Sequence, residues 1–545
     1  MSTQFGIQPE LSVANEPVQD YAPGCAKRAA LEVTLDEMSE ARCDLPSIID
    51  GKSVLTGDIR PSISPHCHTR VLGEAHIAGT KEIEGAVSAA KHASMSWSQM
   101  PWEDRARIFL KTADLVAGPW RAKINAATML GQSKSVYQAE IDAAAELIDF
   151  LRFNVVFMQR IYAEQPRSSA GVSNRIDYRP LEGFVYAITP FNFTAIASNL
   201  ACAPALMGNT VVWKPSATAR LSANMIMTIL QEAGLPDGVI NMIHADPVET
   251  SKIILSDRDL AGVHFTGSTP VFDEILQNVS ASRYRNYPRL VGETGGKNFT
   301  LAHPSADTDA LAVAIIRGAF EYQGQKCSAT SRVFVPRSLW PALKDRLIAD
   351  ISSILIGDVA EMRNFMGAVI DIKAWQRLDA AIARAHVSTT ETVLIGNAPD
   401  MSVGYFIPPT LIETTDINSP FLKDEFFGPI ATVFVYEDHG YEDILDHIDK
   451  GSDYGLTGAV FAREADAVHL ALTRLRYAAG NIYINDKSTG AVVGQQPFGG
   501  ARGSGTNDKA GSLWNLARWT SPRTIKESFV SANDYRYPSM MPKPM

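Results

Sequence analysis

Cysteine is scarce in this chain. Its 545 residues include five cysteines, widely spaced along the sequence: Cys25, Cys43, Cys67, Cys202 and Cys327. Such a small, odd number argues against a disulfide framework and is typical of a reducing compartment. No Lys or Arg precedes Lys27, so the sequence shows neither the basic start of a secretory signal nor an Arg-rich transit peptide. We therefore predict a cytoplasmic protein.

An excess of positive charge is also absent. Lys and Arg number 50 against 60 Asp and Glu, which gives a formal net charge of -10. A chain of this charge lacks the basic footprint that binds a nucleic-acid backbone, so small molecules are the expected partners and nucleic acid is not. Hydrophobic residues make up 46% of the chain and charged residues 20%, which excludes a mainly disordered state and suits several globular domains.

One long stretch, residues 183–213, contains no charged side chain and is long enough to cross a bilayer. Pro190 and Pro204 would interrupt a spanning helix. Three asparagines would also need polar partners in hydrocarbon: Asn192, Asn199 and Asn209. We therefore predict a buried strand, loop, helix and strand here, and no membrane partner.

Hydrophobic periodicity predicts helices first and then alternating strands and helices. The first 44 residues form a polar surface arm with one short helix near 26–39, and helices follow from about 80 to 158. Beyond residue 175, apolar runs separated by helical segments predict a parallel sheet, with strands at 184–188, 210–213, 239–243 and 262–265. A second α/β series is predicted after residue 296, with a helix at 307–322 and strands at 332–335 and 431–436.

Common catalytic and metal motifs are missing. The sequence has no Gly-x-Gly-x-x-Gly after a strand, no His-Glu-x-x-His, no Walker A sequence and no Gly-x-Ser-x-Gly. Thr266-Gly267-Ser268 links a predicted strand to a helix, where it is either a phosphate-binding turn or an ordinary tight turn. His66-Cys67-His68 lacks the ligand spacing of zinc sites, so we predict a solvated loop and no metal.

Two side chains lie in contexts that favour chemistry. Cys327 follows a predicted helix and adjoins Lys326, a cation that can lower a thiol pKa; the alternative is an inert buried cysteine. Glu293 lies among glycines in residues 291–296, which can turn the backbone and hold a carboxylate toward a cleft; the alternative is a solvated loop glutamate. Taken singly, these residues leave both alternatives open.

Seven motifs resemble the aldehyde dehydrogenase superfamily, in the order of that family and over about residues 45 to 530. They are Ile188-Thr189-Pro190-Phe191-Asn192-Phe193, Trp213-Lys214-Pro215-Ser216, Phe265-Thr266-Gly267-Ser268, Glu293-Thr294-Gly295-Gly296-Lys297, Gly324-Gln325-Lys326-Cys327, Glu425-Phe426-Phe427-Gly428-Pro429 and Pro497-Phe498-Gly499-Gly500. Together they outweigh the inert alternatives for Cys327 and Glu293.

The resemblance implies an α/β fold with a Rossmann-type cofactor domain, an α/β catalytic domain and an extended oligomerisation flap. The implied ranges are an N-terminal arm at 1–44, a cofactor domain at 45–164 and 183–290, a catalytic domain at 291–490 and a flap at 165–182 and 512–530. Residues 175–179 and 519–526 are expected to pair in the flap and contact a partner subunit. A homodimer or larger homo-oligomer is therefore expected.

Within the superfamily, three segments resemble the subfamily that oxidises L-glutamate γ-semialdehyde, formed from 1-pyrroline-5-carboxylate, to L-glutamate in proline catabolism. These segments are 139–147, 189–194, and 485–490 through 518–522. Two alternatives stay open: a dehydrogenase of another carboxylated aldehyde, such as succinic semialdehyde, and a non-catalytic structural or binding protein of the same fold.

The resemblance also implies the catalytic roles. Cys327 is the nucleophile, and the side-chain amide of Asn192 with the backbone N–H of Cys327 forms the oxyanion hole. Glu293 is the general base for the water that hydrolyses the thioester.

NAD is the implied cofactor. Its adenosine ribose would meet Lys214 and Ser216, its pyrophosphate Gly267 and Ser268, and its nicotinamide end Glu425 and Phe427. Many relatives carry Glu where this chain has Ala217, so the carboxylate that would repel a 2′-phosphate is missing here. NAD remains the expected cofactor, and NADP is a poorer but possible substitute.

For the substrate, the resemblance implies two aromatic side chains around the aliphatic stem and a small polar anchor for the α-carboxylate. Phe193 and Phe498 are the aromatic pair, and Glu146 lies near the amino end of the substrate. The anchor is Ser328 with the backbone of Gly490 and Ala491. Members of the subfamily often have Ser where Ala491 stands, so backbone N–H groups must bind the carboxylate here.

Overall fold

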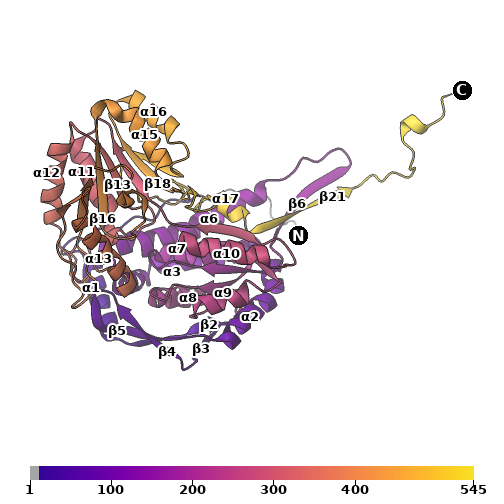
Figure 1. Ribbon diagram of the computed structural model, residues 1–545. Coiled ribbons are helices and arrows are strands. Elements are labelled where there is room, and N and C mark those ends of the chain that lie inside the picture. Colours follow the sequence, from indigo (N-terminus) through magenta and orange to yellow (C-terminus); the bar gives the residue numbers. More distant parts are fainter. Residues whose placement is uncertain (1–10, 545) are drawn as a thin grey trace.

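Two seven-stranded sheets form the body of the protein in this computed structural model, which describes residues 11–544 (Figure 1). In the first sheet five strands run parallel, and β2 and β3 complete one edge in antiparallel pairing. Its strand order is β11 (Arg289–Glu293), β10 (Leu260–Thr266), β7 (Phe184–Ile188), β8 (Thr210–Lys214), β9 (Ile240–Met242), β2 (Ser47–Ile49) and β3 (Lys52–Val54). The predicted parallel sheet is therefore confirmed, with an antiparallel edge that hydrophobic periodicity did not indicate.

The second sheet is parallel except for its edge strand β14. Its order is β14 (Glu391–Ile395), β15 (Thr410–Thr414), β16 (Ile430–Tyr436), β13 (Thr330–Pro336), β12 (Asn298–Ala302), β18 (Thr457–Phe461) and β19 (Asn481–Ile484). The strands predicted at 332–335 and 431–436 lie inside β13 and β16. The second α/β series is thus confirmed.

Helices cover both sheets, as expected for parallel strands that are buried on two faces. Around the first sheet lie α2 (Thr80–Gln99), α3 (Trp102–Ala117), α4 (Arg121–Gln132), α6 (Leu147–Ala163), α7 (Thr194–Leu206), α8 (Arg220–Ala233), α9 (Pro247–Ile254) and α10 (Thr269–Ala281). With the second sheet lie α11 (Thr308–Phe320), α12 (Trp340–Ser352), α13 (Ile372–His386), α15 (Tyr441–Lys450) and α16 (Ala465–Arg474) (Figure 1).

Shorter elements connect these layers. A three-stranded sheet has the order β1 (Cys43–Leu45), β5 (Cys67–His76) and β4 (Ile59–Ser64), and β17 (Tyr454–Gly455) pairs with β20 (Ala501–Arg502). The remaining helical segments are α1 (Ala26–Glu40), α5 (Val136–Ala139), the π-helix η1 (Glu140–Glu146), α14 (Pro420–Lys423), α17 (Leu513–Ala517), and the 3-10 turns η2 (Glu321–Gly324), η3 (Asp438–Gly440) and η4 (Pro538–Met540). The helix predicted near 26–39 is α1.

The uncharged stretch 183–213 forms β7, a loop, α7 and β8, as predicted. The expectation that Pro204 would interrupt a helix is wrong, because Pro204 lies inside α7, in its last turn. Proline cannot donate to the carbonyl four residues before it, here that of Leu200. His264 replaces the missing donor, since its Nδ1 lies 3.0 Å from the Leu200 oxygen. Among residues 11–544, no helix is long and apolar enough to span a membrane.

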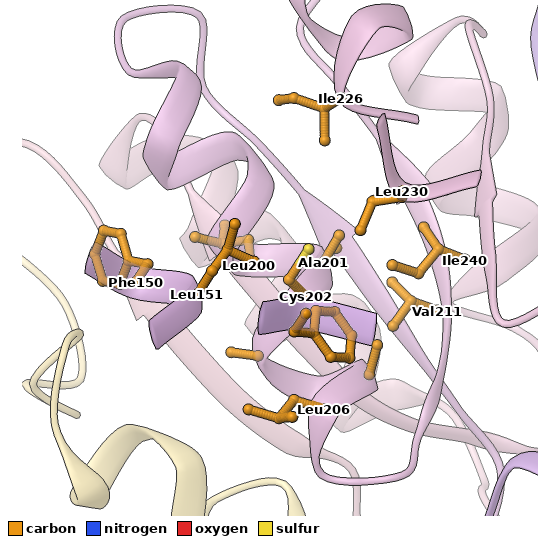
Figure 2. Packing of buried hydrophobic residues seen from close by; sticks show 14 of the residues in the cluster. Phe150, Leu151, Leu200, Ala201, Cys202, Leu206, Val211, Ile226, Leu230 and Ile240 are labelled. Atoms are coloured by element: carbon orange, nitrogen blue, oxygen red, sulfur yellow. The ribbon is translucent and has the colours of Figure 1, made fainter. Parts of the chain in front are cut away.

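Helix α7 is the centre of the largest apolar cluster. Leu200, Ala201 and Cys202 pack between α6, α8 and the strands β8 and β9 (Figure 2). The side chains that surround them are Phe150 and Leu151, Ile226 and Leu230, and Val211 and Ile240 (Figure 2). Because protein interiors are close-packed, this environment fixes α7 and the loop that enters it.

In the first part of the chain, one expectation needs correction. Residues 11–24 are mostly exposed, as predicted for a surface arm, with Tyr21 buried. His66 is buried where a solvated loop was predicted: its Nδ1 lies 3.1 Å from the Ser133 hydroxyl and its Nε2 3.3 Å from an Asp358 oxygen. Burial lowers the pKa of His66 to about 4. Within residues 11–544, no group of three or more His, Cys, Asp or Glu side chains is placed to hold a metal ion.

A two-stranded ribbon projects from the body (Figure 1). It consists of β6 (Val172–Pro180) and β21 (Thr520–Ser528), which pair antiparallel over their whole length. Two ion pairs bridge the strands, Arg175 with Glu527 at 2.8 Å and Arg523 with Asp177 at 2.7 Å. The predicted pairing of 175–179 with 519–526 is confirmed.

Candidate active site

Two cavities meet at Cys327. The smaller has a volume of about 500 Å³ and the larger about 1100 Å³, and the cysteine lines both. Ile196, Phe265 and Thr266 also lie on the shared wall. A molecule in either cavity can therefore reach the same sulfur.

The loop between η2 and β13 holds Cys327 rigidly. Asn298 Nδ2 donates to the carbonyl of Cys327 at 2.7 Å and to that of Ala329 at 2.9 Å. Gly296 lies against this loop: a Cβ there would come within 2.4 Å of the Cys327 carbonyl oxygen, so a larger residue would displace it.

The Cys327 thiol is 8% exposed, and its electrostatic environment differs from the expectation. Burial raises its pKa well above the usual value, and the carboxyls of Glu293 and Glu425 add to the effect. Lys326 does not lower it, because its ammonium turns away to Glu321, 3.1 Å from Oε2. The thiol is therefore protonated at neutral pH before ligands bind.

Asn192 lies beside the cysteine loop, in the turn between β7 and α7. Its side-chain amide donates to the Gln325 carbonyl at 3.0 Å, which fixes its orientation. The second N–H of this amide has no acceptor among residues 11–544, and Asn192 lines the larger cavity together with Cys327. This arrangement leaves a donor for an oxygen bound next to the sulfur.

A buried ion pair positions that turn. Lys134 Nζ donates to Asp142 Oδ2 at 2.7 Å, and both side chains are fully buried. The Asp142 carboxylate also accepts the backbone N–H of Thr194 at 3.0 Å and that of Ala195 at 2.9 Å. It thereby caps the first turn of α7, where a negative charge is favoured. The Lys134 ammonium lies 4.0 Å from the centre of the Phe193 ring.

Neither Lys134 nor a role for Asp142 was predicted from the sequence, although Asp142 lies within the quoted segment 139–147. The available signal was a Lys and an Asp eight residues apart. That pattern alone does not distinguish a buried pair from two solvated charges.

Glu293 ends β11 and lines the smaller cavity. Its Oε1 is buried and has no hydrogen-bond partner among the described residues. Burial raises the pKa of this carboxyl to about 8, while Lys509 acts weakly in the opposite direction. A carboxyl group in a cavity, with a pKa near neutral pH, is suited to general acid–base catalysis.

The residues predicted to bind substrate line the smaller cavity together: Phe193, Ser328, Gly490, Ala491, Phe498 and Glu146. The Ser328 hydroxyl lies 2.7 Å from that of Thr489, at the start of the loop that carries Gly490. Gly490 has φ of +99°, a backbone conformation that side chains disfavour, so glycine suits this turn.

Glu146 reaches the cavity from a deformed helix. Helix α5, the π-helix η1 and α6 run without a break from Val136 to Ala163, and Glu146 is the last residue of η1. Such π-helical turns occur frequently at functional sites. Burial raises the pKa of Glu146 well above its usual value, and the nearby Asp142 adds to the effect.

Two lysines of the smaller cavity were missed as candidates. Lys326 and Lys487 both line it, and both contact Glu321, each at 3.1 Å from Oε2. Two cations share one buried carboxylate here, so this wall carries a net positive charge that suits an anionic substrate. Lys487 lies in the segment 485–490 already quoted for the resemblance, which was the available signal.

The N-terminal arm closes the same cavity from outside. Asn15 Nδ2 donates to Asp149 Oδ2 and to the Val493 carbonyl, both at 2.8 Å, and its Oδ1 accepts from Gln495 at 2.9 Å. The adjacent Glu16 is held by Arg121. Asn15 and Glu16 both line the cavity, a contact that the sequence did not predict.

All six residues predicted to bind the cofactor line the larger cavity: Lys214, Ser216, Gly267, Ser268, Glu425 and Phe427. Ser268 precedes α10 without capping it, so its hydroxyl stays available to a ligand. The backbone N–H of Gly267 is not available, because it donates to the Glu293 carbonyl at 3.1 Å. A Cβ at Gly267 would come within 2.6 Å of the Phe265 ring, so this glycine contributes space.

At the opposite end of that cavity, Glu425 Oε1 accepts the backbone N–H of Gly296 at 2.8 Å, which holds the carboxylate beside the cysteine loop. The Phe427 ring lies edge-on to Phe191, with centres 5.9 Å apart. Polar groups at both ends and an aromatic wall fit a long dinucleotide with a flat ring near Cys327.

Comparison with known proteins agrees with this geometry. The model of the aldehyde dehydrogenase family matches residues 55–525. The chain belongs to the aldehyde dehydrogenase family. It is 48% identical to the mitochondrial delta-1-pyrroline-5-carboxylate dehydrogenase of Bos taurus, over 97% of this chain and 95% of the relative. It is 49% identical to the delta-1-pyrroline-5-carboxylate dehydrogenase of Agaricus bisporus, over 98% of both chains.

Solved structures show the same likeness. The delta-pyrroline-5-carboxylate dehydrogenase of Mycobacterium tuberculosis bound with NAD superposes with a TM-score of 0.95 at 53% identity, over 99% of this chain and 100% of the other. The 1-pyrroline-5-carboxylate dehydrogenase from Thermus with bound NAD gives a TM-score of 0.89 at 29% identity, over 96% of this chain and 99% of the other. The predicted fold class is confirmed.

The Lys134–Asp142 pair generates a prediction about stability. Lys134→Met leaves the Asp142 carboxylate buried without its counter-charge, which should lower the free energy of unfolding by about 3–5 kcal/mol. The double variant Lys134→Met/Asp142→Asn should recover part of this loss because no charge remains. As a control, Lys91→Met removes the more exposed ion pair with Asp257 and should cost about 0–1 kcal/mol. Thermal unfolding monitored by circular dichroism makes the comparison; equal losses in Lys134→Met and Lys91→Met would contradict the assigned role.

Proposed function

We propose that this protein is an NAD-dependent dehydrogenase that oxidises L-glutamate γ-semialdehyde, formed from 1-pyrroline-5-carboxylate, to L-glutamate in proline catabolism. The observation that carries the proposal is the position of Cys327 between two cavities, one suited to a dinucleotide and one to a short carboxylated molecule. The relatives named above support the choice of aldehyde, because their names specify pyrroline-5-carboxylate.

The reaction begins at the sulfur of Cys327. The buried thiol first loses its proton to water, the thiolate attacks the aldehyde carbon, a C–S bond forms, and the π electron pair moves to the oxygen. The free N–H of the Asn192 amide and the backbone N–H of Cys327 stabilise the resulting alkoxide. Phe193 and Phe498 hold the aliphatic stem so that the carbonyl carbon stays beside the sulfur.

When bound, NAD supplies the acceptor for the hydride, and a thioester remains on Cys327. Glu293 then takes a proton from a water molecule, whose oxygen attacks the thioester carbon. The C–S bond breaks, the thiolate leaves with the electron pair, and a carboxylate is released. Lys214 and Ser216 would hold the adenosine ribose, Gly267 and Ser268 the pyrophosphate, and Glu425 and Phe427 the nicotinamide end.

The smaller cavity distinguishes the two ends of the substrate. Ser328 and the backbone of Gly490 and Ala491 bind the α-carboxylate, and the positive wall of Lys326 and Lys487 favours its charge. Glu146 binds the amino group. Burial and the neighbouring Asp142 raise the pKa of this carboxyl, and an ammonium beside it would favour the ionised form. Succinic semialdehyde, the second candidate, shares the carboxylate but has no amino group for Glu146.

We also propose the domain division implied by the resemblance: an arm at 1–44, a cofactor domain at 45–164 and 183–290, a catalytic domain at 291–490 and a flap at 165–182 and 512–530. The two sheets and the β6–β21 ribbon support it. The ribbon has two free edges within the described residues, which a partner subunit would cover. We therefore propose a homodimer or larger homo-oligomer, which light scattering after gel filtration tests.

A cytoplasmic location is the remaining proposal. All five cysteines are free, including Cys25, Cys43 and Cys67, which are at least partly accessible. Free, accessible thiols are typical of a reducing compartment. Fractionation of cells that express the protein tests this location, and recovery with mitochondria would contradict it.

Replacement of the nucleophile tests the proposed function directly. Cys327→Ser should bind NAD with unchanged affinity, because the cofactor cavity is intact, and should lose dehydrogenase activity, because a hydroxyl ionises far less readily than a thiol. NADH absorbance with pyrroline-5-carboxylate measures activity, and titration calorimetry measures NAD binding. Activity within about tenfold of the wild type would contradict the assignment.

The carboxylate anchor predicts substrate preference. A bound aldehyde excludes water from the donors of Ser328 and the 490–491 backbone. An aldehyde of the same length without the α-carboxylate gives these donors no acceptor, which costs about 1–3 kcal/mol. Its kcat/KM should therefore be lower by tenfold or more. Ser328→Ala should reduce the difference in kcat/KM between the two aldehydes. Equal kcat/KM for both aldehydes in the wild type would leave only a general aldehyde dehydrogenase.

The pKa of Glu293 predicts the pH dependence. The base acts only when ionised, so the steady-state rate should rise with pH through about 8. Glu293→Gln should lose this rise of the steady-state rate with pH.

The same variant should retain a burst of about one NADH per active site in rapid mixing, because thioester hydrolysis is slowed more than hydride transfer. Asn192→Ala should instead slow the burst, by roughly a hundredfold or more. A Gln variant without a burst would mean that Glu293 mainly activates Cys327.

A further inference from the structure

One lysine holds the turn that carries Phe498 at the edge of the smaller cavity. Lys509 lines this cavity, and its Nζ donates to the carbonyl of Gly499 at 2.9 Å and to that of Gly480 at 2.8 Å. The same ammonium lies 3.3 Å from Oδ1 of Asn481, the first residue of β19. Three oxygens thus match its three N–H groups, so Lys509 has no donor left for a substrate.

Backbone contacts bring Lys509 close to this turn. The N–H of Phe498 donates to the carbonyl of Ala510 at 3.0 Å, and the N–H of Ala510 donates to that of Phe498 at 2.7 Å. Asn481 Nδ2 donates to the Pro497 carbonyl at 3.0 Å. The Phe498 turn, residues 497–499, is therefore joined to the start of β19 on both sides of its aromatic residue.

The backbone at Lys509 adopts an unfavourable conformation. Its φ is +53°, in the left-handed region that few residues other than glycine adopt. Such a conformation persists where the surrounding contacts stabilise it, and it is found frequently at functional sites. A glycine would suit this backbone better, so the lysine side chain and its contacts are what the position supplies.

The segment that carries Lys509 is also joined to the end of β11. Gly505 pairs with Glu293 in an isolated bridge, and the N–H of Thr506 donates to the Gly292 carbonyl at 2.9 Å. The three acceptors of the Lys509 ammonium are uncharged, so they leave its positive charge uncompensated. Burial raises the pKa of the Glu293 carboxyl, and the charge of Lys509 lowers it.

The other titratable groups around Glu293 are opposed by burial or held in ion pairs. Burial raises the pKa of four of them and lowers that of a fifth to about 3; the four are Cys327, Glu146, Glu425 and Asp149, and the fifth is His264. The remaining groups form ion pairs without Lys509, namely Lys326 and Lys487 with Glu321, and Asp508 with Arg518. Lys509 is the cation that acts on Glu293.

We propose that Lys509 is a positioning residue of this reaction, which holds Phe498 against the substrate and presents a fixed positive charge to Glu293. The inference rests on the proposed function, in which Phe498 holds the aliphatic stem and Glu293 activates the water. Without the ammonium, the carbonyls of Gly480 and Gly499 lose a donor, which is unfavourable away from water, and the turn shifts. Lys509 thus affects both groups without touching the substrate.

A double-mutant cycle between Lys509 and Phe498 tests the positioning role. Lys509→Met keeps a long side chain and removes the three donors. We expect it to lower kcat/KM for pyrroline-5-carboxylate by about tenfold or more, mainly through KM. In the Phe498→Ala background, which already lacks the ring, the same change should cost less than about threefold. As a control, Lys450→Met removes an exposed cation from α15 and should leave kcat/KM within about twofold.

The pH profile tests the role of the charge. Because the Lys509 ammonium lowers the pKa of Glu293, its loss in Lys509→Met should move the rise of the steady-state rate to higher pH. Asn481→Ala releases the Phe498 turn from β19 and keeps the ammonium. It should therefore lower kcat/KM, again less in the Phe498→Ala background, and leave the midpoint of the pH profile unchanged. This variant also tests the positioning role should Lys509→Met fail to fold.

The outcomes separate this inference from the proposed function. A loss of kcat/KM that is as large in the Phe498→Ala background as in the wild type, for Lys509→Met or for Asn481→Ala, overturns the inference. Such a loss would come from a general structural role that does not act through the aromatic ring. An unchanged pH midpoint in Lys509→Met overturns the role of the charge. Wild-type protein that does not oxidise pyrroline-5-carboxylate contradicts the proposed function itself.

Discussion

The geometry of the site depends on the Asp142 carboxylate, which is buried with no solvent to stabilise its charge. It is bound by the Lys134 ammonium and by two backbone N–H groups of α7. These three contacts connect the π-helical turn, the segment between α4 and α5, and the first turn of α7, and so determine where Asn192 and Phe193 lie. The apolar packing around Leu200 fixes the other end of the same helix (Figure 2). The Asp142 carboxylate thus orients the start of α7, and the apolar packing around Leu200 makes the helix rigid.

The candidate acids of the smaller cavity share one property, since burial raises the pKa of Glu146, Glu293 and Cys327 together. Their charges oppose one another, so proton gain at one site eases ionisation at the next. The cavity is close to neutral on this side and positive on the Lys326–Lys487 side. Under the proposed function, an anionic substrate would enter without repulsion, and its ammonium would favour the ionised form of these carboxyls.

Local patterns were sufficient for the strands and for the family, and insufficient for contacts between distant residues. The runs 184–188 and 210–213 became β7 and β8 because alternation with helices is a local property. The motif around Cys327 pointed to the residue that lines both cavities. The effect expected from Lys326 was wrong, because only the fold shows that its ammonium turns to Glu321. The expectations for Pro204 and His66 were wrong for the same reason, because their partners, His264 for the Pro204 turn and Asp358 for His66, are remote in sequence.

The wall that Asn15 forms gives the site an order of assembly. Asn15 bonds to Asp149 and to Val493, which lies 478 residues later in the chain. At ribosomal rates of about 5–20 residues per second, the arm spends about 25 to 95 s without its second partner. It can dock on α6 early, yet the wall of the cavity is completed only after Val493 has been synthesised. A shorter nascent chain therefore carries an open pocket.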